Sequence, residues 1–456
     1  MSLRWVITPK VINGQPSVKA RLVARGFEEL QDFRTDSPTC SKEGLRIALL
    51  LLVSQSWSLH SLDVKTAFLQ GESINRDLYV KPPKEAGTNK LWKLQKTVYG
   101  LADASRSWYL KLRSELIKLK GKPVSLDQGI FLWFDGSTLF GLMACFVDDV
   151  LWAGTNQFVI TINKLKETFS IGAEYNTDFK YIGIHLQQND DGTISIDQKD
   201  YVKDLEVITL EQDRKGLSKQ EPVNEIERSQ IRQVIGKLNW VAGMTRPEIS
   251  FTVSEISSRI GSATLDDIKR INKTVKFLQS TPGFITIPKL DLNSIKLKVF
   301  TDASFNNLND GNSQGGHIVF CTDATGNCTP ISWSSNKVKR VVRSTLAAET
   351  LSFSDGAESG IHLSNMLKEF APQLRTLEIE CITDSRSLFE SAGTTTSVSD
   401  KRLRVEINCI REMIKNNEIV IKWIKGEGQL SNVLTKAGAS PFSLMDVIQS
   451  GKFLDG

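Results

Sequence analysis

The sequence is poor in the residues on which metal, thiol and disulfide chemistry most often depends. It holds 4 histidines and 6 cysteines in 456 residues, with no metal-ligand spacing among the histidines and no CxxC pair among the cysteines. A reducing compartment and carboxylate chemistry are therefore the expectation. Long apolar runs are also lacking: the longest aliphatic run, residues 47–53, is far below the ~20 residues of a bilayer span and is expected to form a buried helix. No signal-peptide pattern follows Met1, and no membrane partner is expected.

Composition and charge describe a folded, weakly basic protein. Apolar residues make up 40% and charged residues 24%, which is ordinary for a globular chain, and the length suggests roughly two to four domains. The net charge of +5 is small, but basic residues gather in two places. Either cluster alone is consistent with a solvated surface, whereas two clusters flanking acidic motifs favour a nucleic-acid partner. The clusters are Arg4, Lys10, Lys19, Arg21 and Arg25, all before the first acid, Glu28, and Lys337, Lys339, Arg340 and Arg343.

Turn signals and periodicity divide the chain. Asn-Gly at residues 13–14, between apolar runs, predicts a β-hairpin, and residues 189–192 predict a second one. Residues 229–279 have a helical pattern in two amphipathic stretches, interrupted at residues 246–247. A strand pattern then returns, which places a domain boundary near residue 290.

A first acidic constellation lies in the N-terminal half. Asp148 and Asp149 stand side by side in the apolar run MACFVDDVLWAG (143–154), and Asp63 follows a strand-like segment. Buried carboxylates are costly unless a turn, a cation or a metal accompanies them. An acidic hairpin turn and a helix N-cap are the simplest alternatives. A pair of divalent metals ~4 Å apart would require such acids to converge from separate elements.

A second constellation lies beyond residue 290. The segments LKVFTDAS (297–304) and IECITDSR (379–386) share alternating apolar residues followed by Thr-Asp. Because side chains alternate along a strand, Asp302 and Asp384 would leave the same ends of two similar strands on equivalent faces. Such strands are expected to lie side by side.

A helix is predicted between these two strands. It runs from Ser344, a plausible N-cap, to Phe370 and carries Glu349 in its first turns. A carboxylate there would reach the strand ends. The alternative is that Glu349 only complements the helix dipole.

Ten segments, in order along the chain, carry a family resemblance. The first six are KARLVARGF (19–27), LDVKTAFLQG (62–71), KTVYGLADASRSWY (96–109), FVDD (146–149), YIGIHL (181–186) and IGKLNWVAGMTRPEISF (235–251). The last four are SWSSNK (332–337), STLAAET (344–350), TDSRS (383–387) and GQLSNVLTKAG (428–438). The first six resemble the fingers and palm of a reverse transcriptase from copia-type LTR retrotransposons and the stretch beyond that palm. The last four resemble the ribonuclease H domain that follows the polymerase in the same elements.

The resemblance implies an α+β fold class. A right-hand polymerase with fingers, palm and a helical thumb-like region would be followed by an α/β ribonuclease H-like domain. The implied ranges are 1–205 for fingers and palm, 206–290 for the helical thumb or connection region, 291–438 for the ribonuclease H-like domain and 439–456 for a C-terminal tail.

The resemblance also implies a polymerase site. Asp63, Asp148 and Asp149 match the catalytic carboxylates that hold two Mg²⁺, for which Mn²⁺ can substitute. Lys19 and Arg21 resemble the fingers residues that bind the triphosphate, since both side chains form charge-assisted hydrogen bonds with phosphate.

Three further residues are implied to surround the incoming nucleotide. Phe68 resembles the steric gate that excludes a 2′-hydroxyl, with a core aromatic role as the alternative. Tyr99 and Gly100 match the turn that packs near the nucleotide. The family usually has a Gln and a Pro after the Gly-Leu of this turn, whereas this chain has Asp103 and Ser105, a departure that bears on fidelity or rate.

The ribonuclease H resemblance is incomplete. Asp302, Glu349 and Asp384 match three of four metal-binding acids, which would also hold two Mg²⁺. The fourth position is Asn432, a neutral amide that ligates a hard cation with less charge, so weakened metal binding is expected. The stretch SVSDKRLRVEIN (397–408) lacks the histidine usual in the family. Hybrid cleavage is therefore expected to be slow, altered or absent.

The function implied is that of an RNA- and DNA-directed DNA polymerase with an attached ribonuclease H domain. Its partners would be an RNA template, a DNA primer, an RNA/DNA hybrid and dNTPs, and its location intracellular, in a cytoplasmic virus-like particle or in the nucleus. The alternative is a degenerate or repurposed retroelement protein that binds nucleic acid without catalysis.

Overall fold

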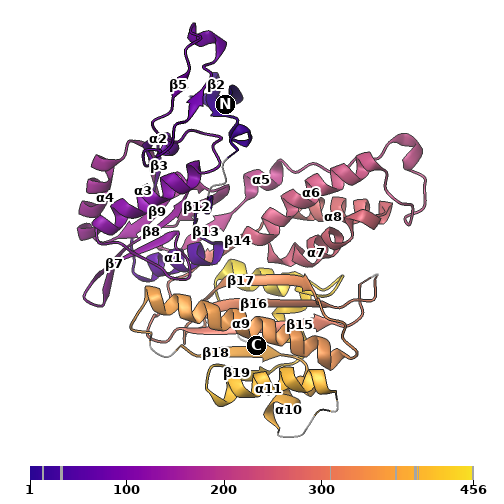
Figure 1. Cartoon of the computed structure of the whole chain (residues 1–456). Helices are drawn as coiled ribbons and strands as arrows, with labels where there is room; N and C mark the ends of the chain where they lie inside the picture. Colours follow the sequence, from indigo (N-terminus) through magenta and orange to yellow (C-terminus); the bar gives the residue numbers. More distant parts are fainter. Residues whose placement is uncertain are drawn as a thin grey trace. The chain divides into compact units, whose positions relative to one another are not determined.

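The computed structural model describes residues 1–12, 15–30, 34–308, 310–374, 377–394, 398 and 400–453. The chain divides into two compact units: unit 1 comprises Met1–Gly44 and Leu59–Asn176, and unit 2 comprises Leu45–Ser58 and Thr177–Gly456. Both units combine helices with sheets, which confirms the predicted α+β class (Figure 1). None of the described helices is long and apolar enough to cross a bilayer. The four predicted domain ranges divide the chain differently and remain a prediction.

Unit 1 is built on a six-stranded sheet and two helices. The strands, in their order across the sheet, are β10 (Ile171–Asn176), β3 (His60–Val64), β9 (Asp149–Gly154), β8 (Thr138–Phe146), β7 (Ile130–Asp135) and β6 (Lys122–Pro123), and the helices are α3 (Ala104–Lys118) and α4 (Asn156–Thr168). Alternate residues of the strands, such as Leu62 and Val64, enter one apolar core. Trp108 of α3 and Phe158 of α4 enter the same core, so both helices cover that face of the sheet.

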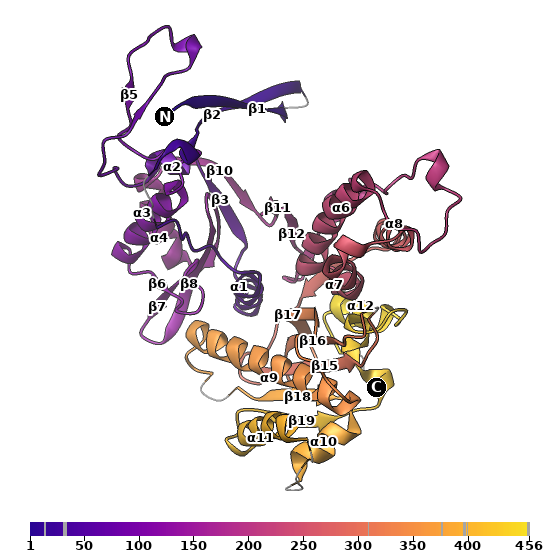
Figure 2. The same cartoon turned by 45° about the vertical axis from the view of Figure 1, so that its right-hand side comes forward.

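A long hairpin precedes this sheet in the sequence. β1 (Leu3–Ile12) pairs antiparallel with β2 (Gln15–Ala24), from Leu3 opposite Ala24 to Ile12 opposite Gln15 (Figure 2). The strands of the first predicted hairpin are thereby confirmed, while its predicted turn, residues 13–14, lies outside the described residues. The remaining elements of unit 1 that bear on the site are α2 (Ala67–Gln70), β4 (Tyr79–Val80) and β5 (Trp92–Lys93).

Helix α1 (Lys42–Ser54) contains the aliphatic run. Every residue from 47 to 53 is at most 2% exposed, so the predicted buried helix is confirmed. Within unit 2, the buried Arg46 of this helix donates to the carbonyls of Gly243 (2.8 Å) and Ile331 (2.9 Å) and stacks 3.8 Å from the ring centre of Trp333. One guanidinium thus satisfies carbonyls that are far apart in the sequence.

The first part of unit 2 joins a small antiparallel sheet to a group of helices. The sheet contains β11 (Asp178–Tyr181), β12 (Ile184–Gln188), β13 (Ile194–Asp197) and β14 (Phe284–Ile287), and the helices are α5 (Lys199–Lys203), α6 (Glu225–Met244), α7 (Ser250–Ser258) and α8 (Leu265–Ser280). β12 and β13 form the second predicted hairpin, with Gly192 at φ 86° in its turn. Two helical stretches were predicted over residues 229–279, whereas the structure has three helices there, α6, α7 and α8. α7 ends early, and Asp267 accepts the Thr264 N–H at 2.9 Å to cap a separate helix.

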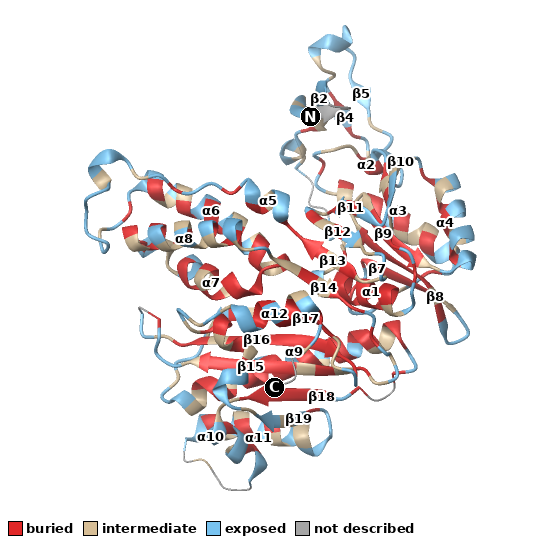
Figure 3. Cartoon of the chain, turned by 180° about the vertical axis from the view of Figure 1, so that it is seen from behind, coloured by how far each residue is buried: buried red, intermediate tan, exposed pale blue. Residues whose placement is uncertain are grey.

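The second part of unit 2 is a five-stranded mixed sheet with helices. Its order is β17 (Cys328–Lys337), β16 (Gln314–Thr322), β15 (Lys296–Ser304), β18 (Ile379–Thr383) and β19 (Val420–Trp423), and its helices are α9 (Thr345–Phe370), α10 (Arg386–Gly393), α11 (Lys401–Lys415) and α12 (Phe442–Ser450). β15 and β18 run parallel, with Phe300 opposite Ile382, which confirms that the two similar strands lie side by side. Their residues are largely buried (Figure 3). The Ser344 hydroxyl accepts the Ala347 N–H at 3.2 Å, so α9 begins where predicted.

Candidate functional site

Asp63 and Asp149 face each other across two antiparallel strands of unit 1. Asp63 of β3 is the register partner of Asp149, the first residue of β9. Directly opposite residues of an antiparallel pair project to the same face, so both carboxylates lie on one side of the sheet. Asp148 lies in the turn between β8 and β9, where its carbonyl accepts the Val64 N–H at 2.9 Å. The structure thus brings together the three acids predicted for the first site, here called the first acid site.

The turn that carries Asp148 is tight and strained. Phe146 and Asp149 form the last pair of the β8–β9 hairpin, which leaves Val147 and Asp148 as a two-residue loop. Val147 has φ 58°, in the left-handed region where such turns usually hold glycine. A β-branched residue in this conformation costs about 1–3 kcal/mol, and strain of this kind gathers at functional sites.

Electrostatic repulsion is concentrated at the first acid site. Burial, followed by the charges of Asp148 and Asp63, raises the pKa of Asp149 to about 6. Burial and the charge of Asp63 also raise the pKa of Asp148, against the opposing effect of Lys19 and Arg21 of β2. Three half-buried carboxylates gathered in this way form an all-oxygen donor set, which suits hard divalent cations.

The sequence patterns did not indicate one residue that shapes this site. Gly172 of β10 lies beside Asp63, and a Cβ atom on it would stand 2.2 Å from Asp63 Oδ2. Any side chain at this position would therefore displace the carboxylate. A glycine in a strand interior is a general signal of such close approach, but its partner cannot be read from the sequence.

The predicted nucleotide-binding residues gather on the β2 side of the first acid site. Lys19 is exposed and Arg21 half-buried on the same face of β2, and both lie near enough to Asp148 to affect its pKa. The Arg21 guanidinium carbon lies 5.8 Å from the ring centre of Tyr99. The ring of Phe68, in α2, meets Tyr99 edge-on with 4.8 Å between centroids, and Phe68 also packs on the core. The structure therefore brings these four residues together.

Backbone hydrogen bonds join the end of β2 to the turn at Tyr99 and Gly100. The Ala24 N–H donates to the Tyr99 carbonyl at 2.7 Å, and the Gly26 N–H donates to the Gly100 carbonyl at 3.1 Å. Gly100 has φ 93°, and a Cβ atom there would lie 2.0 Å from the Ala24 carbonyl oxygen. This position accepts only glycine.

Asp103, where the chain departs from the family pattern, belongs to an ion-pair group. Arg76 Nη1 lies 2.7 Å from Asp103 Oδ2, and Arg76 Nε lies 2.7 Å from Glu29 Oε1. Burial lowers the pKa of Arg76, but its hydrogen bonds to Asp103 and Glu29 outweigh this and raise it. Through Arg76, Asp103 thus links the start of α3 to Glu29 in the loop after β2. No contact among the described residues explains Ser105, which stands where the family usually has proline.

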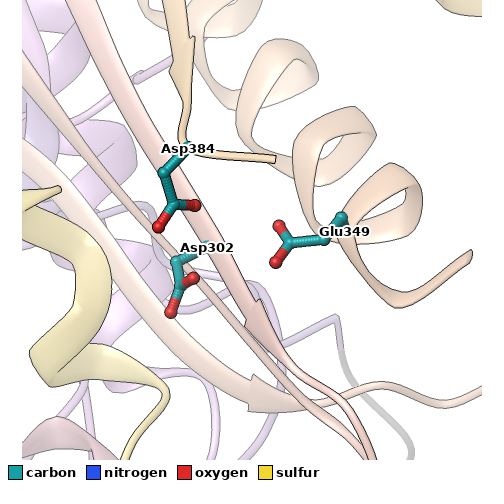
Figure 4. A group of neighbouring side chains, drawn as sticks. All are labelled: Asp302, Glu349 and Asp384. Carbon is teal, nitrogen blue, oxygen red and sulfur yellow. The ribbon is translucent and has the colours of Figure 1, made fainter. Parts of the chain in front are cut away.

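The second acid site lies in unit 2, where β15 and β18 end beside α9. Ligand atoms of Asp302, Glu349 and Asp384 all lie within 4.8 Å of one another (Figure 4). Among the described residues this is the single group of three or more potential metal ligands at that spacing, so the three aspartates of unit 1 are less tightly gathered. The three acids predicted for the second site do converge.

Two of these acids are deeply buried. Asp302 is 0% exposed and Glu349 is 6% exposed, and Glu349 Oε2 has no hydrogen-bond partner among the described residues. Burial, followed by the charges of Asp302 and Asp384, raises the pKa of Glu349 to about 9. An orphaned, buried carboxylate oxygen aimed at two further acids fits a divalent cation as the missing partner.

The fourth predicted ligand, Asn432, lies near the second acid site, but both polar atoms of its side chain are already hydrogen-bonded within the protein. Its Nδ2 donates to the Gly426 carbonyl at 2.8 Å, and its Oδ1 accepts from Lys436 Nζ at 2.5 Å. Lys436 also donates to Asp302 Oδ1 at 3.0 Å, and the Thr435 hydroxyl donates to Asp302 Oδ2. Lys436 and Thr435 were not predicted, because only the fold brings the segment after β19 onto the end of β15.

Comparisons with known proteins agree with the predicted family. Residues 1–212 match the family described as reverse transcriptase (RNA-dependent DNA polymerase). The chain is 27% identical over 456 residues to the retrovirus-related Pol polyprotein from transposon RE1 of Arabidopsis thaliana, covering 95% of this chain and 30% of that protein. It is 24% identical over 446 residues to the polyprotein from transposon TNT 1-94 of Nicotiana tabacum, covering 92% and 33%. The chain thus spans about a third of the length of these relatives.

Solved structures that match part of the chain include ribonucleases H. An RNase H1 in complex with an RNA/DNA hybrid matches with a TM-score of 0.24 and 20% identity, over 31% of this chain and 94% of that one. RNase H1 from Halobacterium salinarum matches with a TM-score of 0.24 and 14% identity, over 31% and 94%.

Residues 1–212 are therefore similar to the reverse transcriptase family. Over nearly its whole length the chain is homologous to the Pol polyproteins of copia-type retrotransposons, as its motifs predicted.

The burial of Glu349 predicts a pH-dependent stability in EDTA. Its pKa is about 9 in the folded state against an ordinary 4.5, so the unfolded chain loses this proton first as pH rises. The free energy of unfolding should fall between about pH 5 and pH 9. Glu349→Gln should lack this pH dependence, and its free energy of unfolding at pH 8 should exceed that of the wild type by about 1–3 kcal/mol. Urea unfolding across this range measures it, with the exposed Glu358→Gln on the same helix as control. A slope identical in Glu349→Gln and wild type would contradict the assignment.

Proposed function

We propose that the chain is an RNA- and DNA-directed DNA polymerase whose nucleotidyl transfer takes place at the first acid site. The observation that carries the proposal is the pairing of Asp63 with Asp149, next to Asp148 and opposite two cationic side chains of β2. Carboxylates with adjacent cationic side chains can bind both metals and a triphosphate. A simple acidic hairpin turn would not require Lys19 and Arg21 beside it.

Each part of the site has its own task in this proposal. Asp63, Asp148 and Asp149 hold two Mg²⁺, which when bound would activate the primer 3′-hydroxyl and neutralise the triphosphate and the leaving pyrophosphate. Lys19 and Arg21 bind the phosphates of the incoming dNTP through charge-assisted hydrogen bonds.

Phe68 is proposed as the gate against ribonucleotides. Its edge-on contact with Tyr99 and its packing on the core hold the ring in one orientation. A fixed ring beside the sugar would exclude a 2′-hydroxyl by volume. The core role and the gate role are compatible, because packing supplies the rigidity that the gate needs.

At the second acid site we infer a ribonuclease H with weak divalent-metal binding. Asp302, Glu349 and Asp384 supply three acidic ligands, and the unpartnered Glu349 oxygen fits a cation. Asn432 contributes no charge, and the ammonium of Lys436 bound to Asp302 already offsets one negative charge. Less charge remains to hold two dications, so slow cleavage of an RNA/DNA hybrid is expected.

Nucleic acid is the proposed partner, and the basic clusters are its proposed contacts. Part of their charge is used within the protein: Lys337 pairs with Asp310 and Arg340 with Glu406. Lys339 and Arg343 are exposed, as is Lys19 of the N-terminal cluster. Exposed Lys and Arg side chains bind phosphates with little sequence preference. The expected location, in a virus-like particle or the nucleus, remains a prediction.

A binder without catalysis is the second candidate, which Asn432 favours. Against it stands the first acid site, where three carboxylates are kept together despite mutual repulsion. A chain released from catalysis gains nothing from that arrangement. A protein that binds hybrid in a salt-sensitive manner, with turnover at neither site, would establish this alternative.

Asp148→Asn should abolish DNA synthesis without affecting the second site. Removing one carboxylate from the metal-binding set should lower Mg²⁺-dependent primer extension by about 1,000-fold or more, with hybrid binding retained. One assay, dNTP incorporation on a labelled RNA template, reports extension and RNA cleavage together. Asp135→Asn, at the exposed last residue of β7, is the control. Extension by Asp148→Asn at the wild-type rate would disprove the assignment of the first acid site.

Phe68→Ala should relax discrimination against ribonucleotides. Loss of the ring opens space beside the sugar, so the ratio of kcat/KM for dNTP over NTP should fall by about 10-fold or more. Phe140→Ala removes a comparably half-buried ring from the same core at a distance from the site, and should leave the ratio unchanged. Single-nucleotide incorporation measures both. An unaltered ratio in Phe68→Ala would leave this ring with a packing role only.

A further inference from the structure

The strained turn of the first acid site is held from outside its own hairpin. Two consecutive carbonyls of the turn each accept a hydrogen bond from a different element: Trp108 Nε1 of α3 donates to the Val147 carbonyl at 2.6 Å, and the Val64 N–H of β3 donates to the Asp148 carbonyl at 2.9 Å. The Val64 bond belongs to ordinary strand pairing. The indole bond does not, and it acts on the residue with φ 58°.

Trp108 is itself fixed by packing. It is 1% exposed, and its ring meets Phe169 edge-on with 5.1 Å between centroids. A buried indole N–H requires a hydrogen-bond partner. Here the partner is the carbonyl of Val147, the residue immediately before Asp148. The donor is thus rigid, and the acceptor is the carbonyl of the residue in the left-handed region.

We propose that Trp108 is a positioning residue for the polymerase reaction. Its indole N–H holds Val147 in the left-handed conformation and thereby sets where the Asp148 carboxylate lies relative to Asp63 and Asp149. The inference rests on the proposed function of the first acid site. Trp108 is proposed to touch no substrate and to act only through the turn. Displacing a catalytic carboxylate by about 1 Å lowers the reaction rate by about 100-fold.

The chain contains a matched control for this proposal. Trp133 of β7 is also 1% exposed and belongs to the same core, and its indole donates to the Leu119 carbonyl at 2.8 Å. Trp133→Phe and Trp108→Phe therefore remove the same chemical group and the same kind of hydrogen bond. Only Trp108 is bonded to the turn that carries Asp148.

The experiment compares dNTP incorporation by the two variants of the full chain, with their melting temperatures. Both substitutions should lower the melting temperature to a similar extent. Trp108→Phe should lower kcat by about 10- to 100-fold with KM for dNTP within about 3-fold, whereas Trp133→Phe should keep kcat within about 3-fold of wild type. Equal kcat in two equally destabilised variants would overturn the proposal.

A second measurement separates this inference from the proposed function. Hydrogen exchange of a peptide spanning residues 143–152 should quicken in Trp108→Phe relative to Trp133→Phe, because the turn loses its external bond. This readout requires no enzymatic activity. If exchange is faster in Trp108→Phe but the wild-type chain extends no primer, Trp108 does hold the turn and the proposed polymerase function is wrong. Unchanged exchange together with an active wild type would refute the role of Trp108 alone.

Discussion

The pairing of β3 with β9 in unit 1 is the constraint from which the rest of the account follows. It sets Asp63 opposite Asp149, so two like charges occupy one face of a sheet at neighbouring positions. Like charges directly opposite each other destabilise a strand pair. The pairing is nevertheless maintained by the apolar residues on the other face of the same strands, such as Leu62 and Val150, which enter the core under α3 and α4. The core thus holds an arrangement that the carboxylates themselves oppose.

Backbone irregularities refine this arrangement around the acids. The left-handed Val147 turns the chain within two residues, and the absent side chain of Gly172 leaves room for the Asp63 carboxylate. Both features cost stability: a β-branched residue is strained at positive φ, and glycine weakens the interior of a strand. The second acid site is built differently: two parallel strands and a capped helix converge, and within the described part of the chain one buried oxygen of Glu349 has no partner. The two sites therefore concentrate negative charge by different structural means.

Local patterns predicted the features that depend on local physics. Alternation along two similar strands predicted that Asp302 and Asp384 would meet, and a hydroxyl before an apolar run predicted the start of α9 at Ser344. Contacts between distant segments could not be predicted in this way. Arg76 bonds Asp103 only because a loop folds back, and Lys436 reaches Asp302 across 134 positions of the sequence.

The three aspartates of unit 1 are proposed to share divalent metal. Fe²⁺ substituted for Mg²⁺ reduces added hydrogen peroxide to hydroxide and a hydroxyl radical and is itself oxidised to Fe³⁺. The radical cuts the backbone close to the bound ion, so the fragments of the full chain map the metal directly. The account predicts cuts near residue 63 and near residues 148–149, suppressed by excess Mg²⁺, in addition to cuts around Asp302 and Asp384. Cleavage confined to the second acid site, with none at the β3–β9 pair, would contradict it.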